Sequence, residues 1–277
     1  TDFGIFEIGM NHSFEILPLT AMVRPEVAIV TTVEPVHLAQ FPGIEAIADA
    51  KGEIFSGLMP GGVAVINRDN PQFDRLKAHA AASPAGRMVT FGEHSSANVR
   101  LVRARCTADA SFVEANVLGV PLAFRLGAPG RHMVQNALAV LAAVHVLGAD
   151  LALAGLSLAE VEPADGRGKR LALDAGSGVI TVLDEAYNAN PSSMRAAISV
   201  LASVPVARRG RRVAVLGDML ELGDAGPGLH AGLADAVVEA GLDLVFAAGP
   251  LMKNLYEALP KAQQGGYAAD SAALEPM

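Results

Sequence analysis

Short apolar runs alternate with segments of helical periodicity along this chain, and this alternation constrains its fold more than any other feature. In the first part, strand candidates lie at residues 3–8, 27–33, 62–66 and 88–91, and helical patterns lie at residues 43–58 and 71–82. Strands joined through helices pair in parallel, because each crossover returns the chain to the same end of the sheet. We therefore predict an α/β fold with a central, mostly parallel sheet and helices on both of its faces.

The alternation changes at two places, which suggests how the chain is divided. Residues 99–126 carry apolar positions without helical period, which predicts a small antiparallel meander, and residues 131–147 predict a buried helix closed by Gly148. Residues 163–169 are polar and rich in Gly and Pro, so we place a domain boundary there, giving domains 1–166 and 167–277. The second domain is predicted to be a Rossmann-like α/β unit, with strands at residues 179–183, 212–216 and 244–247 and helices at residues 192–202, 230–240 and 251–259.

Charge and cysteine content exclude several classes of protein. The formal net charge is -8 and no long basic stripe offsets it, so nucleic acid is not expected as the main partner. The single cysteine excludes an internal disulfide framework and fits a reducing compartment. No stretch has the length and flanks of a signal peptide or a membrane span. We expect a cytoplasmic protein, and a monomer.

The densest polar cluster follows the predicted strand 179–183. Residues 184–191 hold Asp184, Glu185, Tyr187, Asn188 and Asn190, and the helix predicted next would start with Asn190 as its cap. The cluster thus falls at the carboxyl end of a strand, where open α/β sheets bind ligands. A structural turn needs fewer acids and amides, so we favour a binding role over a plain turn.

Other polar residues at strand ends are weaker candidates for chemistry. Glu7 ends the first predicted strand and could meet a ligand or a metal, with an ordinary acid at a strand end as an equal alternative. His37 follows the predicted strand at residues 27–33 and could bind a metal, although a solvated histidine is the simpler interpretation. Lys51 lies in a helical pattern and could simply be a surface lysine paired with an acid. Asp218 lies in the Gly-bounded loop of residues 217–223, which we expect at the same sheet edge as residues 184–191; His230, at the start of a predicted helix, is weaker still.

Taken together, these segments resemble the Mur ligases of peptidoglycan synthesis. The resemblance rests on residues 7–12, 36–38, 50–55, 130–132 with Asn136, 166–167, 184–191 and 217–223, which occur in the family's order. Residues 187–191 and 217–219 resemble most the members that add D-alanyl-D-alanine, rather than those that add alanine, glutamate or the third residue.

The resemblance implies an ATP-dependent amide-bond ligase with UDP-N-acetylmuramoyl-tripeptide and D-alanyl-D-alanine as its substrates. The tripeptide carboxylate would attack the γ-phosphate of ATP, and the dipeptide amine would then attack the resulting acyl phosphate. Mg²⁺ is implied as well, because a carboxylate must approach a polyanionic phosphate.

Site residues are implied by position in the same way. Glu7, His37 and Lys51 would form the catalytic metal site, with Lys51 matching the carbamylated lysine of the family. Asn136, Arg167, Asp184 and Glu185 would contact the nucleotide, although many relatives carry aspartate where Glu185 stands. Residues expected near the substrates are Asn11, Tyr187, Asn188, Asn190 and Asp218.

Three features depart from the family and leave alternatives open. The sequence contains no Gly-x-x-x-x-Gly-Lys-Ser/Thr loop and opens at Thr1 with a strand-like run, and its tail is expected to end without a final strand. We therefore expect a fragment that lacks the family's N-terminal domain and phosphate loop and has little or no ligase activity. A non-catalytic α/β binding module remains an alternative. A ligase of the folylpolyglutamate synthetase type is another, although residues 187–191 argue against it.

Overall fold

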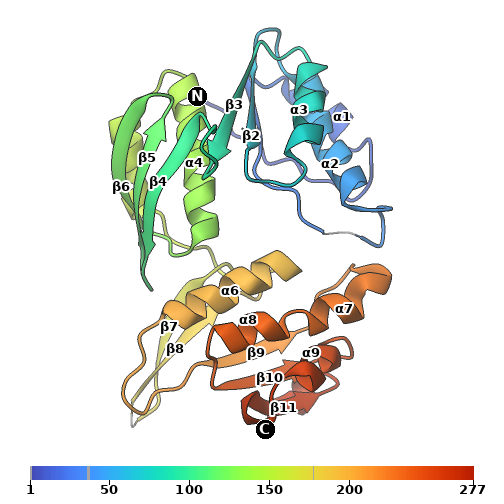
Figure 1. Cartoon of the computed structure of the whole chain (residues 1–277), viewed down its shortest axis with the longest axis vertical. Helices are drawn as coiled ribbons and strands as arrows, with labels where there is room; N and C mark the ends of the chain where they lie inside the picture. The colour runs from blue at the N-terminus through green and yellow to red at the C-terminus, as the bar shows by residue number, and fades with distance from the viewer. Residues whose placement is uncertain (1, 36–37, 177) are drawn as a thin grey trace. The chain divides into compact units, whose positions relative to one another are not determined.

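The computed structural model describes residues 2–35, 38–176 and 178–277, and it divides into two compact units (Figure 1). Unit 1 comprises Thr1–Arg105, Ser111–Gly127 and Arg131–Glu160. Unit 2 comprises Cys106–Ala110, Ala128–Gly130 and Val161–Met277. The candidate residue His37 lies outside the described residues. The domain boundary at residues 166 and 167 stays a prediction.

Within the described residues, unit 1 is built on one sheet in the order β1-β2-β3-β4-β5-β6. Its strands are β1 (Val27–Val30), β2 (Val63–Asn67), β3 (Arg87–Gly92), β4 (Val99–Cys106), β5 (Ser111–Val117) and β6 (Val120–Leu126). The pairs β1/β2, β2/β3 and β3/β4 are parallel, and β5/β6 is antiparallel. Every residue of β2 is buried, which places this strand at the centre of the parallel part. The predicted mostly parallel sheet with an antiparallel meander is confirmed.

The meander owes its hairpin to a tight turn at Leu118 and Gly119. Both residues have positive φ angles, 53° and 97°, as a two-residue turn between right-twisted strands requires. Side chains of β5 then alternate between buried and exposed, because one face of the hairpin packs against the unit and the other meets solvent.

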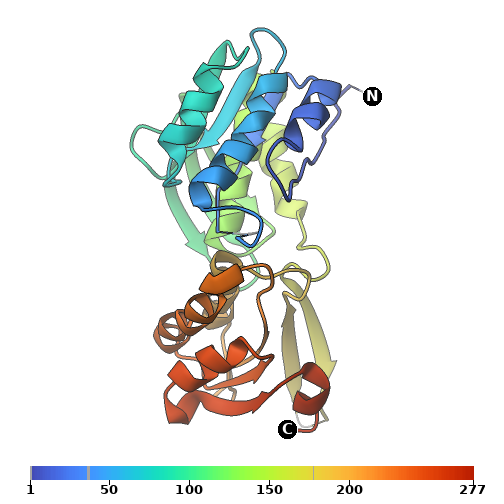
Figure 2. The same ribbon diagram turned by 90° about the vertical axis from the view of Figure 1, so that its right-hand side faces the viewer.

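Helices cover both faces of the sheet of unit 1 (Figures 1 and 2). They are α1 (Ile16–Val23), α2 (Ile44–Gly52) continued by the 3-10 helix η1 (Glu53–Gly57), α3 (Phe73–Ala81), α4 (Arg131–Val146) and α5 (Leu151–Ser157) with η2 (Leu158–Glu160). α4 lies on one face and packs a stripe of buried residues, including Val134, Leu138 and Leu141, against β2, β3 and β5.

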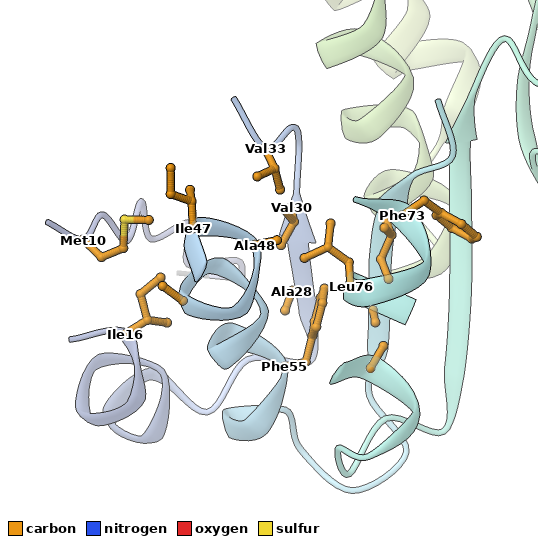
Figure 3. Close-up of a cluster of buried hydrophobic side chains, with 14 of the residues drawn as sticks. Met10, Ile16, Ala28, Val30, Val33, Ile47, Ala48, Phe55, Phe73 and Leu76 are labelled. Carbon is orange, nitrogen blue, oxygen red and sulfur yellow. The ribbon is translucent and has the colours of Figure 1, made fainter. Parts of the chain in front are cut away.

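The opposite face of the same sheet carries a cluster of buried hydrophobic side chains (Figure 3). Ile47 from α2, Phe55 from η1 and Leu76 from α3 meet there and are almost fully buried. Burying one such side chain contributes about 1.5–3 kcal/mol. This core fixes α2, the helix that carries Lys51.

Unit 2 contains two separate sheets among its described residues. β7 (Lys169–Asp174) pairs antiparallel with β8 (Val179–Asp184), whereas β9 (Val213–Gly217), β10 (Leu244–Ala248) and β11 (Gln264–Ala268) form a parallel sheet in the order β11-β10-β9. Its helices are α6 (Pro191–Ser203), η3 (Gly223–Ala225), α7 (Gly226–Ala231), α8 (Ala234–Glu239), α9 (Met252–Ala258), η4 (Lys261–Gln263) and α10 (Ser271–Leu274). Leu233, Val245, Met252 and Leu255 lie at the centre of the core.

Three predictions about the elements were wrong. Residues 3–8 form no strand with any described part of the chain, and Phe3, Ile5 and Phe6 are exposed. An apolar run becomes a strand only where a neighbouring strand pairs with its backbone hydrogen-bonding groups. The tail does hold a strand, β11, followed by the short helix α10. The helix predicted at residues 230–240 is interrupted around Gly232, so that α7 and α8 are separate.

The shared sheet edge predicted for residues 184–191 and 217–223 was also wrong. Asp184 ends β8 and Gly217 ends β9, and these strands belong to different sheets in the described structure. Both loops still follow the carboxyl ends of their strands. No helix in the described ranges is both long and apolar enough to cross a membrane.

Candidate functional site

In unit 2, Asp184 ties the loop of residues 166–168 to the end of β8. One carboxylate oxygen, Oδ2, accepts the backbone N–H of Gly166 at 3.2 Å, and Oδ1 accepts the N–H of Ala186 at 3.1 Å. The Asp184 backbone carbonyl accepts the N–H of Gly168 at 2.8 Å. The structure therefore brings together two regions that the sequence only suggested separately.

Arg167 and Tyr187 meet on this scaffold. The Arg167 guanidinium carbon lies 4.4 Å from the centre of the Tyr187 ring, a cation–π distance. Both side chains are exposed. Among the described residues, no acid or carbonyl accepts a hydrogen bond from the Arg167 guanidinium, so its donors remain available to a ligand.

Glu185 lies beside this pair, against Gly168. Partial desolvation raises the pKa of the Glu185 carboxyl, and the neighbouring Asp184 carboxylate raises it further. A Cβ atom added to Gly168 would lie 3.3 Å from Oε1 of Glu185, a tight contact, and the φ angle of 95° at this position itself favours glycine. Glu185 keeps an exposed surface, and a carboxyl in this position can accept hydrogen bonds from hydroxyl groups.

The two asparagines of the block have local hydrogen-bonding roles. Oδ1 of Asn190 accepts the N–H groups of Ser192 and Ser193, while Ser193 Oγ accepts the N–H of Asn190, which completes a capping box at the start of α6. The cap predicted at Asn190 is confirmed. Asn188 Oδ1 accepts the N–H of Ala189 at 2.8 Å. Contact of either amide with a substrate would involve its Nδ2 group and stays a prediction.

Asp218 is bound to the beginning of α9. Its Oδ1 accepts the N–H of Met252 at 2.7 Å and its Oδ2 accepts that of Leu251 at 3.2 Å. These contacts satisfy backbone donors at a helix start, where a negative charge is also favourable. The side chain is therefore engaged in holding its loop, and its role toward a substrate stays a prediction.

In unit 1, Lys51 is a partly buried lysine near the end of α2. It forms no ion pair and donates no hydrogen bond to another residue in the described ranges, and burial lowers the pKa of its amine. The prediction of a surface lysine paired with an acid is therefore wrong. A lysine in this state is closer to its neutral, nucleophilic form than an exposed one.

The other candidates of unit 1 that the structure describes are exposed. Glu7 and Asn11 lie on the irregular N-terminal segment, where the Asn11 backbone N–H donates to Glu15 Oε2 at 2.7 Å. Asn136 lies on the exposed side of α4. Across residues 2–35, 38–176 and 178–277, no group of three or more His, Cys, Asp and Glu side chains comes together as a metal site.

The structure also shows a polar cluster that the sequence did not reveal. Glu93, which follows β3, pairs with Arg131 at the start of α4 through two contacts of 2.5 Å. Gln135 Nε2 donates to Asp69 Oδ2 at 3.1 Å, and Asp69 accepts the N–H of Glu93 at 2.6 Å. Asp69 and Glu93 follow β2 and β3, and Arg131 and Gln135 lie at the beginning of α4, before Asn136. Only their common place at strand ends could have suggested the cluster.

Family models match most of the chain in two blocks. The Mur ligase middle domain matches residues 1–144, and the Mur ligase, glutamate ligase domain matches residues 169–275. The fold class of unit 1 and the order of these matches agree with the resemblance inferred from the sequence. The chain belongs to the Mur ligase family.

Individual relatives cover nearly the whole chain. The UDP-N-acetylmuramoyl-tripeptide–D-alanyl-D-alanine ligase of Rickettsia prowazekii is 29% identical over 260 residues, which are 94% of this chain and 56% of that protein. The ligase of the same name from Escherichia coli is 33% identical over 90% of this chain and 53% of its own length. A crystal structure of MurF from Acinetobacter baumannii matches with a TM-score of 0.84 and 29% identity, over 94% of this chain and 54% of that one. The chain thus spans about half the length of the relatives it matches.

Proposed function

We propose that this chain forms part of an ATP-dependent ligase that joins D-alanyl-D-alanine to UDP-N-acetylmuramoyl-tripeptide, working in the cytoplasm as a monomer. The observation that carries the proposal is the match to both Mur ligase domains in order, together with similarity to curated ligases of this name over 90% or more of the chain. The unpaired, partly buried Lys51 and the cluster at residues 184–187 support it.

The reaction would proceed in two transfers. A carboxylate oxygen of the tripeptide attacks the γ-phosphorus of MgATP, forming an acyl phosphate and releasing ADP. The dipeptide amine then attacks the acyl carbon, loses a proton, and expels inorganic phosphate. In this scheme Arg167 binds phosphate oxygens, Asn136 and Glu185 bind the nucleoside, and Asn11, Asn188, Asn190 and Asp218 lie near the substrates.

Lys51 would act after reaction with carbon dioxide. The neutral amine forms a bond to the carbon, a proton leaves to water, and an anionic carbamate results. Its lowered pKa favours the neutral amine that this step needs. Glu7, His37 and the carbamate would then offer oxygen and imidazole ligands to magnesium. The described residues do not assemble such a site by themselves, so the scheme routes no step through it.

Phosphate release, combined with mass spectrometry of the product, tests the proposal. We expect this chain by itself to release little or no phosphate. We expect the ligase of which it forms part to release phosphate only with MgATP, UDP-N-acetylmuramoyl-tripeptide and D-alanyl-D-alanine together, and to yield a product extended by the dipeptide. Lys51→Met should abolish turnover. Release supported by glutamate instead of the dipeptide would favour a ligase of the folylpolyglutamate synthetase type. MgATP binding without release under any substrate combination would favour a non-catalytic module.

A further inference from the structure

The carboxylate of Asp184 is committed to the protein backbone. Each of its two oxygens accepts one N–H group, from Gly166 and from Ala186. Glu185, by contrast, accepts no hydrogen bond in the described structure. The two neighbouring acids therefore have different roles: Asp184 binds the loop of residues 166–168, and the Glu185 carboxyl remains available to bind a ligand.

Gly166 lets this loop come close to the chain after β8. Its φ angle is 71°, in the left-handed region that favours glycine, and a Cβ atom there would lie 2.9 Å from both N and Cβ of Tyr187. The Tyr187 N–H also donates to the Gly166 carbonyl at 3.1 Å. The base of the Tyr187 side chain is thus fixed next to Arg167.

The Tyr187 ring in turn restrains the Arg167 side chain. A free arginine loses rotamer entropy when it binds a ligand, and an aromatic face that already holds the guanidinium reduces that loss. The guanidinium carbon lies over the ring at 4.4 Å from its centre, and this contact does not require the guanidinium N–H groups to donate to an acceptor. Those N–H groups donate to none of the residues that the structure describes.

We infer that Tyr187 is a positioning residue for Arg167: its ring, on a loop fastened by Asp184, presents the guanidinium to phosphate oxygens of the nucleotide. Tyr187 then acts through Arg167 and does not itself contact the dipeptide, which revises the substrate-binding role predicted from the sequence. The inference rests on the proposed function, because it assumes a nucleotide as the ligand of Arg167.

Affinity for MgADP, measured by calorimetry on this chain, tests the inference. Tyr187→Leu should weaken binding about threefold to fivefold, the worth of one exposed cation–π contact. Tyr187→Phe should stay within about twofold, because the ring face is kept. In an Arg167→Met background, Tyr187→Leu should add nothing. A matched control is Phe112→Leu, which removes a ring 4.7 Å from Arg105 on unit 1 and should leave MgADP affinity unchanged.

A second measurement does not need the nucleotide. Protons of the Arg167 side chain should show upfield ring-current shifts in NMR spectra of the free chain, retained in Tyr187→Phe and lost in Tyr187→Leu. Absence of these shifts in the unsubstituted chain would overturn the inference. So would an equal loss of affinity from Tyr187→Leu with and without Arg167, since Tyr187 would then contact the ligand itself. Ring-current shifts without any MgADP binding would instead contradict the proposed function.

Discussion

His230 holds the backbone of Met219 through a hydrogen bond inside unit 2. The Met219 N–H donates to Nε2 of His230 at 2.9 Å, and Nδ1 of the same ring lies 2.7 Å from the Gly226 carbonyl. The ring is completely buried. Because a backbone N–H can only donate, Nε2 is the acceptor, and Nδ1 therefore carries the proton that it donates to the carbonyl. His230 thus fixes the loop after β9, including Asp218.

His230→Leu should lower the free energy of unfolding by about 1–3 kcal/mol, because the Met219 N–H and the Gly226 carbonyl would lose a buried partner. Urea unfolding measures the loss, and amide exchange at Met219 should accelerate in parallel. His145, on α4, serves as the control, since its ring has no hydrogen bond within the described ranges. His145→Leu should change stability by less than about 0.5 kcal/mol. Equal losses in both variants would show that the His230 hydrogen bonds contribute nothing specific.

Gly52→Ala should destabilise the protein although it lies in a helix. Helix propensity alone predicts a gain of about 0.5–1 kcal/mol. The added Cβ would, however, lie 2.6 Å from Cγ of His79 on α3, so we expect a net loss of about 1–3 kcal/mol. Thermal unfolding would measure it.

Two further variants isolate the clash at Gly52. In a His79→Ala background, Gly52→Ala should become neutral or stabilising, because the ring is gone. Gly228 on α7 has open space around its Cα and no positive φ, so Gly228→Ala should not destabilise. A stable Gly52→Ala variant with intact His79 would mean that α2 and α3 separate easily.

The N-terminus of α6 depends on Asn190. Asn190→Ala removes the acceptor for two backbone N–H groups and should cost about 0.5–2 kcal/mol of stability. Asn190→Asp keeps an acceptor at the same place and should retain most of it. Urea unfolding of the two variants gives the comparison. If both lost the same amount, the Nδ2 group of Asn190, and not its capping oxygen, would be the stabilising atom.

The cap at Asn190 was predictable because its signal is local, and so were most strands. β2, for example, follows from a run of small and β-branched residues whose burial needs no distant information. The run at residues 3–8 has a similar apolar pattern, but whether such a run forms a strand depends on pairing with another strand, which the local sequence does not show. β11 was missed because Gln264, Gly265 and Gly266 give it no strand pattern.

The candidate site was predictable as a set of residues but not as an arrangement. Sequence suggested Arg167, Asp184 and Tyr187, whereas the close approach at Gly166 that joins them appears only in three dimensions. Asp218 illustrates the same limit. Its partners, Leu251 and Met252, lie more than thirty residues away, so no local pattern could show that its carboxylate caps α9.

Asp49 should make stability depend on pH in the acid range. Burial raises the pKa of its carboxyl, but hydrogen bonds from His79 and Arg75 outweigh burial and bring the pKa below its ordinary value of 3.8. The unfolded chain therefore binds this proton at higher pH than the folded chain. The stabilisation is present above the ordinary value and is lost as the pH falls through the folded pKa.

Asp49→Asn should abolish this contribution, so the stability difference between the two proteins should shrink as the pH falls from about 5 to about 3. Urea unfolding across that range measures it. His79→Asn removes the ring Nε2 that lies 2.9 Å from Asp49 Oδ1. This variant should keep the pH dependence of stability that Asp49 causes, but with a smaller amplitude than in the unsubstituted chain. A difference that stays constant with pH would rule out the carboxylate as its source.

Lys51 should affect stability with the opposite pH dependence. Burial lowers the pKa of its amine from the ordinary value of 10.5, and no acid among the described residues compensates the charge. Below the folded pKa the folded chain carries the full cost of a buried ammonium. As the pH rises from the folded pKa toward 10.5, the unfolded chain binds more protons than the folded one, so stability increases.

In buffer free of carbon dioxide, Lys51→Met should therefore raise the free energy of unfolding at neutral pH, and this gain should shrink as the pH rises through the lowered pKa. Lys77, exposed on α3, provides the control, and Lys77→Met should stay within about 0.5 kcal/mol of the unsubstituted chain. Adding bicarbonate should alter the stability of the unsubstituted chain more than that of Lys51→Met, because a methionine at position 51 cannot form a carbamate there. If Lys51→Met destabilised the chain in buffer free of carbon dioxide at every pH, the apolar contacts of the lysine stem would outweigh its charge.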